Sequence, residues 1–263
     1  MCLIAFAWQS HRDWPLIVAA NRDEYHTRPT APAGYWVDAP HIFGGRDMQD
    51  GGTWMAVTRD ARFAALTNFR DAAPATPTPR SRGHLVADYL RTDAPPLAHS
   101  HVLASIRDNY RGFNLLFGDR ESLWYMPDRG SGPAPVVAGV HALSNARLNT
   151  PWPKASGLAE VMRGLLDGPA AAPDELSDIL FDALADTRPA PDELLPATGV
   201  GVERERQLSS RMIVAPLYGT RSSSVMLVAS NGGIHFAERS YYPDGRATGT
   251  INEHIAPSDR RPG

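Results

Sequence analysis

The chain lacks most features that mark secreted, membrane-spanning or disulfide-stabilised proteins. It has one cysteine in 263 residues, so it cannot form an internal disulfide. Its first residues, MCLIAFAWQ, have neither a basic region nor an apolar stretch of secretory length. No apolar run approaches the roughly 20 residues that span a bilayer. These absences predict a chain that does not cross a membrane and works in the reducing cytoplasm.

Net charge is also low, and the common cofactor motifs are missing. A formal charge of −3 and a pI near 6.3 create no field that would attract nucleic acid or anionic lipid. The nine histidines show no H-x-x-x-H or Cys/His spacing of a zinc site, and the glycines of DGG and SNGG follow no phosphate-loop pattern. We therefore expect a small-molecule or acylated ligand, no nucleic acid, no metal and no required cofactor. The oligomeric state stays open.

Apolar residues occur in short runs. They make up 43% of the sequence, enough for a substantial core in one domain over residues 1–263. Residues 28–53 are rich in Pro, Gly and Asp, which is typical of a long surface excursion. Elsewhere, runs rich in strand formers predict one strand at 140–145 and antiparallel hairpins at 3–21, 53–68, 112–127 and 222–241.

Helical spacing of apolar residues indicates four helices. Strands and helices are grouped along the chain instead of alternating, which favours an α+β fold whose helices cover sheet faces. The Pro-rich stretches PATPTP and RPAPDELLPATG are interpreted as loops within the domain. The predicted helices span 84–91, 97–110, 157–166 and 173–186.

The single cysteine stands at position 2, where removal of the initiator Met would leave a thiol and a free α-amine on one residue. A thiol has an ordinary pKa of about 8.5 and an α-amine of about 7.7 to 8.0, so a nucleophile would sit beside a partly neutral base. A first turn centred near residues 11 and 12 places Asn21 across from Cys2 and Arg22 beside it, within a register of one or two residues.

Neighbouring side chains would complete a catalytic site. The guanidinium of Arg22 would favour the thiolate, and the carboxylate of Asp23 would hold or orient the α-amine. An oxyanion needs donors such as backbone N–H groups or Asn side chains. Asn145, at the end of a predicted strand, and Asn68 are both candidates.

Eight ordered blocks of the sequence resemble one family. The blocks are MC at the start, NRDE at 21–24, GGRDMQDGGTWMAVT, LTNFR, SRGHL, YRGFNLLFGD, LSNARLNTPWPK and YGTRSSSVML. They cover nearly the whole chain and resemble the NRDE family, also called the transport-and-Golgi-organisation family. The resemblance implies an N-terminal-nucleophile hydrolase-like fold, a four-layer αββα sandwich of two antiparallel sheets. That superfamily includes penicillin V acylase, bile-salt hydrolase and acid ceramidase, which use an N-terminal Cys to cleave non-peptide amide bonds.

The resemblance also implies roles for matched residues. Cys2 matches the nucleophile of those enzymes, and NRDE matches the Arg and Asp of their second strand. The relatives space these two as R-x-x-D, whereas Arg22 and Asp23 are adjacent here. The acid position therefore falls on Asp23 or Glu24, and the arginine position on Arg22 or Asn21.

Two functions follow from the resemblance. The first is an N-terminal-Cys amidohydrolase acting on a linear amide or thioester, in which Asn145 resembles the oxyanion-hole Asn and Arg221 a later arginine of the site. The second is suggested by family links to haem trafficking, lipid or acyl-CoA handling and Golgi organisation. It is a non-catalytic carrier whose ligand touches Cys2 or His26. Haem would be held non-covalently, because no C-x-x-C-H motif is present. The remaining predicted ligand contacts are Asn21, Glu24 and Asn68.

Overall fold

The computed structural model describes residues 2–70, 80–128, 130, 132–166, 168 and 171–257. Met1 and the PATPTP stretch lie outside these residues. The described strands form two antiparallel sheets. The first has the order β10 (Gly139–Leu143), β1 (Cys2–Trp8), β2 (Leu16–Tyr25), β11 (Tyr218–Val228), β12 (Ile234–Tyr241), β13 (Ala247–Ile255). The second has the order β3 (Thr30–Trp36), β4 (Ala39–Asp47), β5 (Met55–Thr58), β6 (Phe63–Asn68), β7 (Phe113–Gly118), β8 (Leu123–Pro127), β9 (Ala134–Pro135).

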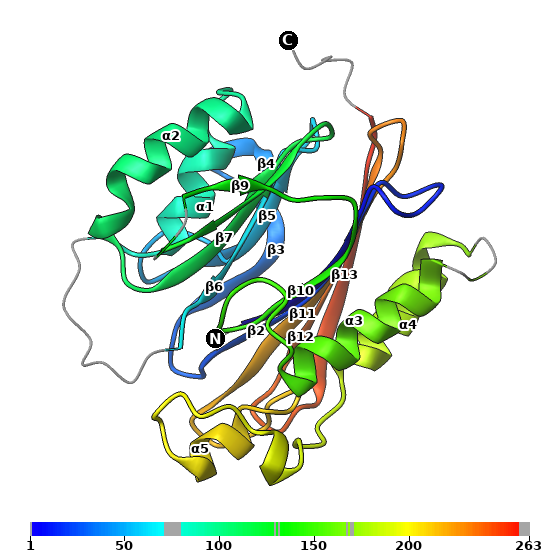
Figure 1. The fold of residues 1–263 in the computed structure, drawn as a ribbon. Coiled ribbons are helices and arrows are strands. Elements are labelled where there is room, and N and C mark those ends of the chain that lie inside the picture. Colours follow the sequence, from blue (N-terminus) through cyan, green and yellow to red (C-terminus); the bar gives the residue numbers. More distant parts are fainter. Residues whose placement is uncertain are drawn as a thin grey trace.

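Helices cover the outer face of each sheet (Figure 1). One pair packs on the first sheet and another on the second, so the layers run helix, sheet, sheet, helix. None of the described helices is long and apolar enough to cross a bilayer. The helices are α1 (Gly83–Leu90), α2 (Pro96–Ile106), α3 (Pro153–Leu166), α4 (Pro173–Leu184) and α5 (Val202–Gln207), with short 3₁₀ turns η1 (Arg107–Asn109) and η2 (Asp192–Leu194).

Alternation of side chains along the strands explains these layers. In β1, Phe6 packs into the core between the sheets, whereas Leu3 and Ala5 pack against α3 and α4. Burying a side chain such as Phe or Leu contributes about 1.5–3 kcal/mol. The first sheet is therefore apolar on both faces, and this double burial holds the start of β1 firmly in place.

The sequence predicted most of this arrangement. Both sheets and all four predicted helices are present, and the four predicted hairpins and the strand at 140–145 are confirmed. Strand β13 and helix α5 were missed. The β13 sequence, ATGTINEHI, is mostly exposed and lacks apolar alternation, and α5 is short and highly charged. Neither segment carries the periodic apolar signal on which sequence interpretation depends.

One fold prediction is wrong. Residues 28–53 do not form a surface excursion, because β3 and β4 pair as a hairpin at the edge of the second sheet. Ala33 is buried in the core between the sheets. Pro32 is tolerated because β3 is an edge strand, and the register shifts between Ala31 and Gly34. The Pro and Gly content that suggested a loop marks these irregularities instead.

Candidate active site

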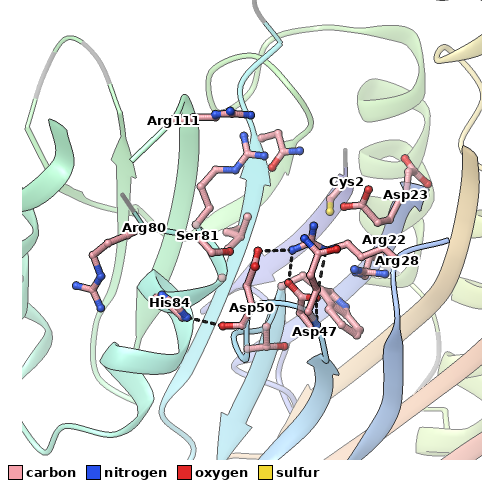
Figure 2. Close-up of a pocket in the computed structure, with 18 residues that line it drawn as sticks. Cys2, Arg22, Asp23, Arg28, Asp47, Asp50, Arg80, Ser81, His84 and Arg111 are labelled. Carbon is pink, nitrogen blue, oxygen red and sulfur yellow. Dashed lines mark hydrogen bonds and ion pairs between the residues drawn. The ribbon is translucent and has the colours of Figure 1, made fainter. Parts of the chain in front are cut away.

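A cavity of about 560 Å³ lies where β1 begins, beside the end of β2 (Figure 2). Its walls come from both sheets, from the segment between β4 and β5, and from the start of α1. Figure 2 shows Cys2 and Asp23 side by side at one end of this cavity, with Arg22 and Arg28 next to them. The cavity wall is mainly polar and charged, and it includes the single thiol of the chain.

Arg22 is the residue directly across from Cys2. The predicted register, with Asn21 in that place, is wrong by one residue. The first hairpin has a seven-residue connection, closed by a hydrogen bond of 2.7 Å from the Gln9 N–H to the Pro15 carbonyl, so the turn centres on residue 12. A one-residue change of register exchanges the faces of every side chain. It places Arg22, instead of Asn21, on the same face as Cys2.

Arg22 is held by neutral groups. Its guanidinium lies 4.3 Å from the ring centroid of Trp54 and donates to the Thr30 hydroxyl at 3.1 Å. The Trp54 ring in turn packs on Gly45, where a Cβ atom would lie 2.1 Å from the ring. Burial lowers the pKa of Arg22, and Cys2 acts in the opposite direction. The absence of a side chain at Gly45 therefore leaves room for the Trp54 ring, and the ring holds the Arg22 guanidinium beside the thiol.

Asp23 is fully buried next to the thiol. Its Oδ1 accepts a hydrogen bond of 2.7 Å from the Thr220 hydroxyl, and its backbone carbonyl accepts one of 3.0 Å from the Tyr218 hydroxyl. Burial raises the pKa of the Asp23 carboxyl, and the ammonium group of Lys154 opposes this shift. The carboxylate thus lies where it can bind a second positive group near Cys2.

Cys2 is 8% exposed and lines the cavity. Burial raises the pKa of Cys2, the nearby Asp23 carboxylate adds to the shift, and Arg22 opposes it. The resting state at neutral pH is therefore a neutral thiol. Nucleophilic attack by such a thiol requires a base that takes its proton.

The two asparagine candidates contact each other, and only one of them lines the cavity. Asn68 lines the cavity at the end of β6, whereas Asn145 is buried and does not line it. The Asn145 amide donates to the Asn68 carbonyl at 2.9 Å, and the Asn145 carbonyl accepts from the Arg70 N–H at 2.7 Å. In this arrangement Asn145 holds the backbone of Asn68, and Asn68 is the asparagine at the cavity wall.

The other predicted residues are divided between the cavity and its surroundings. Glu24 lines the cavity. Asn21 points to the helical face and donates to the carbonyls of Leu184 and Arg211 at 2.9 and 2.8 Å. Arg221 and His26 do not line the cavity. Arg221 donates to the carbonyls of Tyr25 and Arg28, and a ring nitrogen of His26 lies 2.9 Å from the Ala215 carbonyl.

Most of the sequence matches a known family. The profile of Transport and Golgi organisation 2 matches residues 1–243. The chain belongs to this family. The Transport and Golgi organization protein 2 homolog of Bos taurus is 33% identical over 260 residues, covering 91% of this chain and 93% of that protein. The homolog of Homo sapiens is 32% identical over 261 residues, with the same coverage of each.

A solved structure confirms the fold that the family resemblance implied. A mutant of the conjugated bile acid hydrolase from Clostridium perfringens, with one cysteine changed to alanine, is similar with a TM-score of 0.56. The identity is 8%, over 97% of this chain and 92% of that one. At such identity the likeness concerns the fold alone. This family member therefore has the N-terminal-nucleophile hydrolase fold, with two antiparallel sheets between helical layers.

Sequence interpretation of this family member missed Lys154, in the first turn of α3. The residue is 4% exposed, and its Nζ has no hydrogen-bond partner among the described residues. Burial lowers the pKa of Lys154 to about 8, and the carboxylate of Asp23 opposes the shift. One signal was available in the sequence. The chain has 25 arginines and this one lysine, so the position is the exception to a strong preference.

The buried amine of Lys154 predicts a pH dependence of stability. In the unfolded chain its pKa is about 10.4, so above pH 8 the unfolded state binds more protons than the folded state and stability rises with pH. Between pH 8 and 9 this contribution is about 1 kcal/mol. Lys154→Met should lack it. Urea unfolding of wild type, Lys154→Met and the exposed control Arg163→Met at both pH values measures the difference, and equal pH dependence in all three would contradict it.

A second group of titratable residues lies away from the cavity. Asp174, His235 and His254 bring possible metal-ligand atoms within 4.8 Å of one another, which the sequence spacing did not reveal. However, Asp174 lies 3.8 Å from Nε2 of His235, whereas His254 lies 3.4 Å from Nδ1. The two neighbours face different nitrogens of one ring. This geometry does not favour one ion held by all three residues.

Proposed function

We propose that this chain is an N-terminal-cysteine hydrolase of a linear amide or thioester carried by a small or acylated molecule. The observation that supports it is the position of Cys2. The thiol begins a rigid, doubly buried strand, faces a cavity, and lies opposite Arg22 and beside the buried carboxylate of Asp23. A structural cysteine needs no such cavity or charges. A reducing cytoplasmic location, which keeps the thiol free, is part of the proposal.

The proposed reaction starts from a mature chain that begins at Cys2. The neutral α-amine takes the thiol proton while the sulfur attacks the carbonyl carbon. Asp23 holds the resulting ammonium, and Asn68, positioned by Asn145, donates to the oxyanion. Collapse breaks the C–N or C–S bond, and the ammonium returns its proton to the leaving group. Water then attacks the acyl-enzyme thioester while the α-amine takes its proton, the C–S bond to Cys2 breaks, the carboxylic acid leaves, and the ammonium returns the proton to the Cys2 thiolate.

Intact-protein mass spectrometry tests this function. The purified chain is measured before and after exposure to p-nitrophenyl butyrate, an activated ester. We expect the mass without the initiator Met, and one butyryl adduct that maps to Cys2 and disappears with time as water releases it. Cys2→Ala should fold normally, with an unchanged melting temperature, and show no adduct. Surface acylation of lysine does not interfere, because the single lysine is buried.

The alternative is a non-catalytic carrier of haem or of a lipid or acyl-CoA, suggested by the trafficking role in the family name. A retained Met with an inert Cys2 would contradict the hydrolase and favour the carrier. Titration with haem, followed by its visible absorption, and with an acyl-CoA, followed by tryptophan fluorescence, would then identify the ligand. Cys2→Ala serves as the matched variant in both titrations, because a carrier does not need a nucleophile.

A further inference from the structure

The charged groups around the cavity are paired unevenly. Arg28 contacts two carboxylates, Asp47 at 2.5 Å and Asp50 at 2.6 Å. Arg80 pairs with Asp88 at 2.7 Å, and Figure 2 shows it directed away from Cys2. These arginines already have their counter-charges. An additional negative group placed beside Arg28 or Arg80 would therefore gain little.

Arg22 and Arg82 differ from these paired arginines. Neither guanidinium has a carboxylate oxygen within 4.0 Å among the described residues, although both line the cavity with Cys2. Arg82 donates one hydrogen bond of 3.1 Å, to the neutral carbonyl of Gly112. Burial and the neighbouring Arg111 lower the pKa of Arg82, while Cys2 and Glu24 act in the opposite direction. Two partly desolvated cations thus share this wall, and neither forms an ion pair among the described residues.

The start of α1 adds to this positive wall. The helix has no acidic residue in its first turn, and no side chain caps its N-terminus, which lies at the cavity wall. The N-terminal end of a helix carries a partial positive charge. Gly52 and Gly83 allow the close approach, because a Cβ atom on Gly52 would lie 2.4 Å from the Gly83 carbonyl carbon. Backbone contact therefore places Arg82 and the helix end over the cavity.

Two carboxylates near Cys2 must be counted against these cations. Asp23 faces the buried ammonium of Lys154, so its charge is already opposed. Glu24 lines the cavity, is only half-buried, and accepts a hydrogen bond of 2.8 Å from the Tyr25 N–H. Asp47 and Asp50 also line the cavity, but both pair with Arg28. Against Glu24 stand Arg22 and Arg82, which form no ion pair among the described residues. On the wall next to Cys2, two guanidinium groups therefore outnumber one carboxylate.

We propose that this wall is an anion-binding subsite, in which Arg82 and Arg22 bind a carboxylate or phosphate group of the molecule whose carbonyl Cys2 attacks. The inference rests on the proposed hydrolase function and narrows its substrate to an anionic amide or thioester. Arg22 stands directly opposite Cys2, at the spacing of paired strand residues, so the anion lies within a few bonds of the scissile carbonyl. Guanidinium groups suit both oxyanions through paired N–H donors.

Two thiol reagents of nearly equal size test the subsite. Iodoacetate is anionic and iodoacetamide is neutral. In both reagents the Cys2 sulfur displaces iodide from a CH2 carbon, which carries the carboxylate in iodoacetate and the amide in iodoacetamide. The rate with iodoacetate is divided by the rate with iodoacetamide at Cys2, and this ratio is divided by the same ratio for glutathione. The result measures the preference of the site for an anion. We expect a value of about 10 for the wild type. Arg82→Gln should lower it toward 1, Arg82→Lys should restore part of it, and Arg91→Gln, at the far end of α1, should leave it unchanged.

Each outcome separates the subsite from the function on which it rests. A wild-type value near 1, or a value unaffected by Arg82→Gln in a variant that melts normally, would overturn the subsite alone. Alkylation by neither reagent would overturn the nucleophile and the subsite together. Protection against iodoacetate by inorganic phosphate or by acetate, lost in Arg82→Gln, shows which of the two anions the subsite prefers. Protection that persists in Arg82→Gln would place the anion elsewhere.

Discussion

A chain that begins at Cys2 is expected to hydrolyse an activated acyl ester about 10²–10⁴-fold faster than a chain with one glycine added before Cys2. The thiol is buried and neutral at rest, so its attack depends on a base within reach. An added residue turns the α-amine of Cys2 into an amide, which cannot take a proton. The thiol, the cavity and Asp23 are otherwise unchanged. Stopped-flow release of p-nitrophenol from both chains measures the ratio.

The comparison has its own control. Both chains should be alkylated by iodoacetamide at similar rates when the pH is high enough to ionise the thiol directly. Equal hydrolysis rates at neutral pH would show that another group accepts the proton. Lys154 is then the first residue to change, because it is the other buried amine of the site and its pKa is lowered to about 8.

Glu205→Gln is expected to lower the free energy of unfolding by about 3–5 kcal/mol. Glu205 forms an ion pair with Arg70, and both side chains are only 4% exposed. The carboxylate also accepts a hydrogen bond of 2.9 Å from the Thr198 N–H. Without the carboxylate, Arg70 stays charged and buried with no counter-ion, while its guanidinium lies 4.7 Å from the ring centroid of Trp152. Urea unfolding followed by tryptophan fluorescence measures the loss.

A neighbour on the same short helix serves as the matched control. Glu203 pairs with Arg206 at 2.7 Å, but its side chain is 86% exposed, so Glu203→Gln should cause no measurable loss. Equal effects of the two substitutions would mean that burial of the Arg70 pair does not stabilise the fold. A smaller loss in the double variant Arg70→Met, Glu205→Leu than in Glu205→Gln would confirm that the unpaired charge causes the cost.

The sequence predicted the fold better than it predicted the site. Alternating apolar residues identify the first hairpin, because the pattern repeats over whole strands and tolerates local errors. The register of the strands at Cys2 depends instead on one turn residue, and an error of one position exchanged Asn21 and Arg22 across from Cys2. The block SRGHL resembled the family, yet nothing local to it indicates that Arg82 lies at the cavity wall. That placement results from the contact between Gly52 and Gly83.

The same limit applies to groups that meet only in three dimensions. Arg70 and Glu205 are 135 positions apart, and a single sequence gives no signal that they pair. The apolar periodicity predicted the helix of Lys154 from residue 157, but α3 begins at Pro153. The first turn, which contains Lys154, was therefore missed. Whether a charged side chain is buried depends on which elements pack around it. The pattern of residues next to it in the sequence does not show that packing.

Because its single lysine is buried, the folded chain offers very few amines to amine-directed reagents. Twenty-five arginines carry the remaining fixed positive side chains, and a guanidinium does not react with succinimidyl esters at neutral pH. The α-amine that begins the chain is then the main target while the fold is closed. Lys154 is buried in the first turn of α3, and α3 packs on the first sheet, so we expect Lys154 to become available when α3 separates from that sheet. A label on Lys154 therefore records opening of that layer, and its rate of appearance measures how often the helix leaves the sheet.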